Sequence, residues 1–248
     1  MEITATTKLK KSPPWGMREM GHVVAIIAVS LVFLNLAAIV FDLGEVIKTS
    51  SNRSLITLGL FLLQEAIFLI PLYLVLREKL GYFPAKELGL VALPWKKTLL
   101  WVFKALGLIV IFNIGLTQLL NWTGELPGFG SQESHVPLFG TNPLDIALAF
   151  LVLVVIAPVI EEIIFRGFIL QTLNVKTKTW IASLGAALFF GVAHFEFQVL
   201  GVLTLIGLIL NGLFLRSRSL IPSIIFHMLN NGLALTLEIL ISTGKIVL

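Results

Sequence analysis

Three short segments of the chain carry residue types that can do acid–base chemistry. They are Glu161–Arg166, Phe190–His194 and His227–Asn231, and each lies inside a strongly apolar stretch. An ionisable side chain is expensive in such a stretch and therefore indicates a functional site. Two carboxylates, two imidazoles and an amide delivered from membrane helices would suit a hydrolytic centre inside a bilayer.

Helical spacing separates the roles of the two adjacent glutamates. Neighbouring residues point about 100° apart on a helix, so Glu161 and Glu162 cannot both face one pocket squarely. Glu162 and Arg166 are four residues apart, with the carboxylate on the favourable N-terminal side, and are expected to pair. Glu161 is then left to face the site. The alternative is that all three form a snorkelling charged cluster near the inner end of the helix.

The histidine segments show the same four-residue spacing. His227 and Asn231 share one helix face, and Phe190 and His194 share another. A lone histidine on an apolar face is more often an interhelical hydrogen bonder. Two histidines that accompany Glu161 and Asn231 on three separate helices indicate chemistry instead.

Such a set of side chains supports two kinds of hydrolysis. A carboxylate with a histidine can deprotonate a water, while a second histidine with an amide can stabilise an oxyanion. Alternatively, the imidazoles and a carboxylate can hold a zinc ion that acidifies its bound water. The HExxH zinc motif and the Gly-x-Ser-x-Gly elbow are both absent. The chain has no cysteine, which excludes thiolate catalysis and disulfides.

The composition places these residues in a membrane. Of the 248 residues, 57% are hydrophobic and 13% are charged, whereas soluble domains are about a quarter charged. We expect one all-α, polytopic transmembrane helix bundle of seven helices, or eight if residues 121–143 hide a short one. The apolar runs that predict the seven helices are 21–41, 55–77, 98–120, 144–170, 180–195, 197–215 and 219–241.

The chain is expected to have three parts. Residues 1–20 form a basic tail at the membrane interface, 21–143 hold accessory transmembrane helices and loops, and 144–241 form a four-helix catalytic core. The first apolar run is too long for a signal peptide and is expected to be retained. The fifth and sixth runs are expected to form a tight hairpin.

The distribution of lysine and arginine predicts the orientation. With the N-terminus in the cytoplasm, thirteen lie in inner segments and three in outer ones (Lys48, Arg53 and Lys245). The chain is therefore expected to be a multi-pass protein of the cell membrane with a cytoplasmic N-terminus. These basic loops suit anionic lipid rather than nucleic acid.

Several other polar residues lie within the apolar runs. Glu65 is expected either to gate the cavity or to bond Asn113 or Asn35, with a structural role favoured. Asn211 and Glu238 are expected to bond neighbouring helices.

The EExxxR, FxxxH and HxxxN segments resemble those of the CPBP intramembrane endopeptidases, the family of CAAX prenyl proteases and bacteriocin-processing or immunity proteins. The resemblance covers about 161–231, with the motifs in the family's order. It implies that Glu161 and His194 activate the water and that His227 and Asn231 form the oxyanion site. The remaining motif residues, in supporting roles, are Glu162, Arg166 and Phe190.

The spacing leaves metal dependence open. The family is described both as metalloproteases and as metal-independent glutamate proteases, and a zinc ion would be held by Glu161, His194 and His227. An amide such as Asn231 is a poor zinc ligand and a good oxyanion donor. The preferred mechanism therefore requires no cofactor, with zinc as the alternative.

The resulting hypothesis is an intramembrane endopeptidase. Its expected partners are the lipid bilayer and a membrane-associated protein or peptide substrate, either lipidated or a leader peptide. The first alternative is a non-proteolytic immunity or scaffold protein that binds a peptide in the same cavity. The second is a proton-coupled transporter, against which the absence of an internal repeat weighs.

Overall fold

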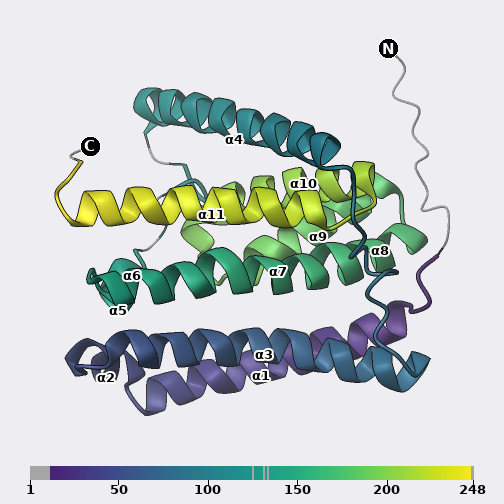
Figure 1. Cartoon of the computed structure of the whole chain (residues 1–248), viewed down its shortest axis with the longest axis horizontal. Coiled ribbons are helices and arrows are strands. Elements are labelled where there is room, and N and C mark those ends of the chain that lie inside the picture. Colours follow the sequence, from purple (N-terminus) through teal and green to yellow (C-terminus); the bar gives the residue numbers. More distant parts are fainter. Residues whose placement is uncertain (1–11, 125, 131, 133, 247–248) are drawn as a thin grey trace. The chain divides into compact units, whose positions relative to one another are not determined.

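All regular secondary structure in the described part of the chain is helical. The structure is a computed structural model that describes residues 12–124, 126–130, 132 and 134–246. Its elements are α1 (Met17–Val40), α2 (Leu43–Thr49), α3 (Arg53–Leu80), α4 (Trp95–Thr123), α5 (Val136–Phe139), α6 (Pro143–Ala149), the π-helix η1 (Phe150–Ile156), α7 (Ala157–Glu162), the π-helix η2 (Ile163–Leu170), α8 (Gln171–Lys176), α9 (Thr179–Val192), the 3₁₀-helix η3 (Phe197–Val199), α10 (Leu200–Ser217) and α11 (Ile221–Ser242) (Figure 1).

The all-α membrane fold predicted from the sequence is confirmed. Among the described residues, six helices are long and apolar enough to cross a membrane, namely Met17–Val40, Arg53–Leu80, Trp95–Thr123, Pro143–Lys176, Phe197–Ser217 and Ile221–Ser242. The predicted count of seven also includes α9, which has 14 residues. At about 1.5 Å per residue, α9 is shorter than the roughly 30 Å hydrocarbon core. The short helix considered for residues 121–143 is α5, with four residues.

The helix that carries the two glutamates is irregular. It runs from Pro143 to Lys176, with π-helical segments on both sides of α7. Pro158 has no N–H, and its ring would clash with the carbonyl four residues earlier in a regular helix. Just before it, the N–H of Ala157 donates to the carbonyl of Val152, five residues earlier. Segments of this kind occur frequently at functional sites.

The described chain falls into two compact units. The α9–α10 unit comprises Met1–Met17, Pro84–Gln132 and Glu162–Phe226. The α1–α3 unit comprises Arg18–Phe83, Glu133–Glu161 and His227–Leu248. The boundary between the two units therefore falls between Glu161 and Glu162, and again just before His227 on α11.

In the α9–α10 unit, small residues let α9 and α10 approach closely, as the predicted hairpin requires. A Cβ atom at Gly207 would lie 3.0 Å from Ala187, and one at Gly191 would lie 2.9 Å from the side chain of Leu200. Membrane helices commonly use glycine and alanine at such interfaces. The close approach brings the hydrogen-bonding groups of α9 within reach of α10.

The segment before α1 also packs in the α9–α10 unit. Trp15 is buried, its indole N–H donates to the hydroxyl of Thr172 at 3.1 Å, and its ring lies 5.7 Å from that of Phe168. Residues 1–11 of the predicted interfacial tail lie outside the described residues.

The α1–α3 unit has its own apolar core. α1 and α3 run antiparallel (Figure 1), and Lys79 near the end of α3 pairs with Glu19 near the start of α1. The hydroxyl of Thr57 on α3 donates to the carbonyl of Leu138 at 3.0 Å and thereby holds α5. The buried core residues are Phe139, Ala149, Val152, Val154 and Leu235.

Candidate active site

Glu162 and Arg166 form a buried ion pair in the α9–α10 unit. Arg166 Nη1 donates to Glu162 Oε1 at 2.9 Å, and both side chains are 0% exposed. The pairing predicted from their four-residue spacing is therefore confirmed. Two charges taken out of water are tolerated only when their hydrogen-bonding groups find partners.

The rest of the Arg166 guanidinium is bound by α10 and α9. Its Nε donates to Asn211 Oδ1 at 3.1 Å, and its Nη2 donates to the carbonyl of Gly207 at 3.2 Å. Asn211 in turn donates to the carbonyl of Ser183 on α9 at 2.8 Å, which confirms its predicted interhelical role. The guanidinium carbon also lies 4.4 Å from the ring centroid of Phe190. Arg166 thus joins three helical segments at the base of the His194 turn.

This network predicts different effects of removing the two adjacent glutamates. Glu162→Ala leaves Arg166 buried without its counter-charge, a change that typically destabilises a protein by about 3–5 kcal/mol. The measurement is the unfolding midpoint in detergent, with Glu161→Ala as the matched control because the Glu161 side chain is 16% exposed. Equal midpoints for the two variants would contradict a structural role for Glu162.

The end of α9 orients His194. The imidazole Nδ1 lies 2.8 Å from the carbonyl oxygen of Phe190, and the two ring centroids are 4.7 Å apart. A carbonyl only accepts hydrogen bonds, so Nδ1 carries the proton and donates it. In the neutral ring Nε2 then keeps its lone pair, as a general base requires. Phe195, which follows, has φ 57°, an uncommon conformation outside glycine.

Glu161 and His227 come together in the α1–α3 unit. His227 Nε2 on α11 lies 3.7 Å from Glu161 Oε2 on α7. This is an ion-pair distance and too long for a hydrogen bond. The His227 side chain is 3% exposed and the Glu161 side chain 16% exposed. Glu161 Oε2 itself is buried and has no hydrogen-bond partner among the described residues, so it is left to accept a hydrogen bond from a bound polar group.

Asn231 lies one turn after His227 on α11, as its spacing predicted. Its Nδ2 donates to the carbonyl of Leu153 at 3.1 Å. A primary amide has two N–H donors, so this bond fixes the orientation of the side chain and leaves the second N–H available.

Glu65 is the residue whose surroundings the sequence did not predict. It is 2% exposed on α3, its Oε2 has no hydrogen-bond partner among the described residues, and it interacts electrostatically with Glu161. The expected bond to Asn35 is wrong, because that amide donates to the carbonyl of Leu31 on its own helix. The sequence did hold a signal for this location, because an ionisable residue near the middle of an apolar run indicates a functional site.

The described structure therefore divides the predicted site residues into two sets. Glu161, His227 and Asn231 belong to the α1–α3 unit, and the others belong to the α9–α10 unit, namely Glu162, Arg166, Phe190 and His194.

The three ligands of the zinc alternative are divided between the two units, with Glu161 and His227 in one and His194 in the other. A catalytic zinc ion usually has three protein ligands. Within neither unit do three described carboxylate and imidazole side chains gather around one point where a metal would fit. The mechanism below uses only the chain's own groups.

Comparison with known proteins gives weak but consistent matches. The chain is 26% identical over 169 residues to an uncharacterized 24.3 kDa protein of Escherichia coli, covering 65% of this chain and 72% of that protein. It is 23% identical over 142 residues to YdiL of Bacillus subtilis (strain 168), which is named as a membrane peptidase, covering 57% of each chain. No solved structure matches.

A match to a protein family covers the region that holds all three motifs. Residues 143–233 match the family described as type II CAAX prenyl endopeptidase Rce1-like. This region extends from the start of α6 to just beyond Asn231 on α11. The resemblance noted in the sequence is therefore confirmed: residues 143–233 are similar to the Rce1-like type II CAAX prenyl endopeptidases.

Proposed function

We propose that the chain is an intramembrane endopeptidase that hydrolyses a peptide bond in a membrane-associated protein, either a lipidated protein or a leader peptide. The Rce1-like match supports the reaction class. The observation that carries the proposal is the pair of Glu161 and His227, in which a carboxylate oxygen without a hydrogen-bond partner lies beside a shielded imidazole, with Asn231 one turn further along α11.

In the proposed first step, Glu161 activates a water molecule. Its carboxylate takes one proton while the water oxygen bonds to the scissile carbonyl carbon, and the C=O π electrons move onto the carbonyl oxygen. The family resemblance assigns His194 to water activation as well, and its Nε2 is free to accept a hydrogen bond. The bond from His194 Nδ1 to the carbonyl of Phe190 supports this role, because it selects the tautomer with Nε2 free.

In the proposed second step, His227 and Asn231 donate hydrogen bonds to the oxyanion. Donors that are already oriented stabilise this charge without reorganising during the reaction. When the carbonyl re-forms, the C–N bond breaks, and Glu161 returns its proton to the leaving nitrogen. The water oxygen and one hydrogen thus end in the new carboxyl group, and the other hydrogen ends on the new amine.

The proposal is tested with purified protein and a library of membrane-associated peptides, in parallel with Glu161→Ala and with and without a chelator. We expect cleavage by the wild type, none by the variant, and no effect of the chelator. Binding of peptides without cleavage by the wild type would instead support the scaffold alternative.

The proposed orientation gives a separate prediction. Thr141 and Thr177 are both exposed in the structure, and the chain has no cysteine to interfere with labelling. The distribution of basic residues places Thr177 in the cytoplasm and Thr141 outside. In intact cells, an impermeant thiol reagent should label Thr141→Cys, whereas Thr177→Cys should require permeabilised cells. The reverse pattern would overturn the orientation.

A further inference from the structure

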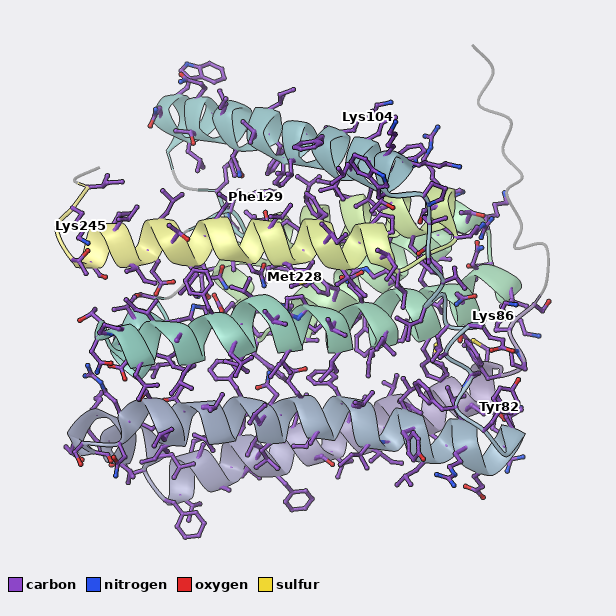
Figure 2. All side chains as sticks on the ribbon, in the orientation of Figure 1. Tyr82, Lys86, Lys104, Phe129, Met228 and Lys245 are labelled. Atoms are coloured by element: carbon purple, nitrogen blue, oxygen red, sulfur yellow. The ribbon has the colours of Figure 1, made fainter. Side chains whose placement is uncertain are left out.

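The α9–α10 unit contains a groove that the proposed chemistry does not use. It has a volume of about 970 Å³ and lies between the C-terminal half of α4, Gly124 with residues 126–130, and Gln198 of η3. Figure 2 labels Phe129 in this segment and shows Lys104 nearer the opposite end of α4. None of the described residues that line the groove carries a charge.

One wall of the groove is held in place by backbone hydrogen bonds. The N–H of Gly130 donates to the carbonyl of Gln198 at 2.8 Å, and the N–H of Gly201 donates to the carbonyl of Gly128 at 2.7 Å. The ring of Phe129 lies so close to Gly201 that a Cβ atom there would be 2.5 Å from it. The segment is thus docked onto the start of α10.

The opposite wall presents a line of polar side chains. Asn113, Thr117 and Asn121 are successive at four-residue intervals on α4 and all line the groove. The Thr117 hydroxyl donates to the backbone carbonyl of Asn113. The carboxamides of Asn113, Asn121 and Gln198 make no hydrogen bond to other described residues. All three of these residues are exposed, so their amides are open to a polar partner in the groove.

The spacing of this line fits an extended peptide. Residues four apart on a helix are separated by about 6 Å along its axis. An extended chain repeats every two residues, or about 6.6–6.8 Å. Successive polar side chains on α4 can therefore meet every second peptide group of a chain lying along the groove.

The groove is also close along the chain to His194, which belongs to the same unit. Gln198 follows His194 by four residues in the same unit, a reach of at most about 14 Å. A substrate with its scissile bond at His194 needs only a few further residues to enter the groove. The lack of a lining cation argues against a phosphate headgroup as the occupant, because phosphate recognition generally uses Arg or Lys.

We propose that the groove of α4, residues 126–130 and Gln198 binds an extended, uncharged stretch of the substrate's backbone that flanks the scissile bond. This inference rests on the proposed function. The carboxamides of Asn113, Asn121 and Gln198 donate to peptide carbonyls and accept from peptide N–H groups, and the apolar lining covers small neutral side chains. The groove acts on substrate affinity and takes no part in the chemical step.

The test compares Asn113→Leu/Asn121→Leu with Gln118→Leu, a matched change on α4 that lies outside the groove lining. The double variant should raise KM by roughly tenfold at unchanged kcat, since each lost hydrogen bond typically weakens binding several-fold. The control should match the wild type. A substrate shortened on the flanking side should be cleaved equally poorly by all three proteins. Equal KM values on the full substrate would overturn the proposal.

A binding measurement separates this inference from the proposed function. A fluorescent, uncharged peptide with the flanking sequence is titrated into wild-type protein in nanodiscs, where no cleavage is needed. Weaker binding by the double variant than by Gln118→Leu supports the groove even if the wild type cleaves nothing. Unchanged peptide binding by the double variant would reject the peptide as the occupant. So would phospholipid that copurifies with the wild type and is lost only from the double variant.

Discussion

Glu161→Gln should lower cleavage of a membrane-peptide substrate by about 10²–10⁴-fold or more, the typical contribution of a positioned general base. The amide has nearly the same shape as the carboxylate but cannot take the proton of the attacking water. Because Glu161 lies beside His227 at 3.7 Å, the substitution also removes the negative charge that faces this imidazole. The measurement is single-turnover cleavage by purified protein.

A folding control makes this result specific. Glu161→Gln should unfold at the wild-type temperature in detergent, whereas Glu162→Gln should unfold earlier because it weakens the buried bond to Arg166. Glu162→Gln should therefore lower activity because less of the protein stays folded. Wild-type turnover by Glu161→Gln would show that another group is the base.

Asn231→Ala should slow turnover by about 10²–10³-fold, the usual loss when one oxyanion donor is removed. The substrate's ground state is bound mainly by other groups, so KM should change little. Asn231→Asp should not restore the rate, since a carboxylate offers no N–H and brings a negative charge toward the oxyanion. Steady-state kinetics of the three proteins provide the measurement.

The same variants distinguish the oxyanion role from a metal site. A carboxylate at this position is a good zinc ligand, whereas an amide is not. Activity that is retained in Asn231→Asp, lost with a chelator and restored by zinc would reject the oxyanion role. A slow Asn231→Asp that does not respond to chelator would support it.

The pairings within one helix could be predicted because helical geometry is local. Glu162 with Arg166, and His227 with Asn231, follow from the four-residue spacing alone. The structure has the predicted ion pair, and it places Asn231 one turn after its histidine. The membrane location likewise follows from composition, which does not depend on how the helices pack.

The partners of isolated polar residues could not be predicted in this way. Glu65 was expected either to gate the cavity or to bond Asn113 or Asn35. It interacts with Glu161, and Asn35 bonds to its own helix. Asn211 was expected to bond a neighbouring helix, but its two particular partners, Arg166 and Ser183, come from the packing of three segments. Periodicity shows which face of a helix is polar and not which other helix meets that face.

Apolar run length and helical spacing are properties of short segments, so they suffice to identify an all-helical membrane protein with three motifs that carry acid–base groups. The approach of Glu161 to His227, the contacts of Arg166 with α9 and α10, and the bond from Asn231 to Leu153 are visible only in the folded chain. Such contacts depend on how closely helices approach, which for α9 and α10 is set by small residues such as Gly207 and Ala187.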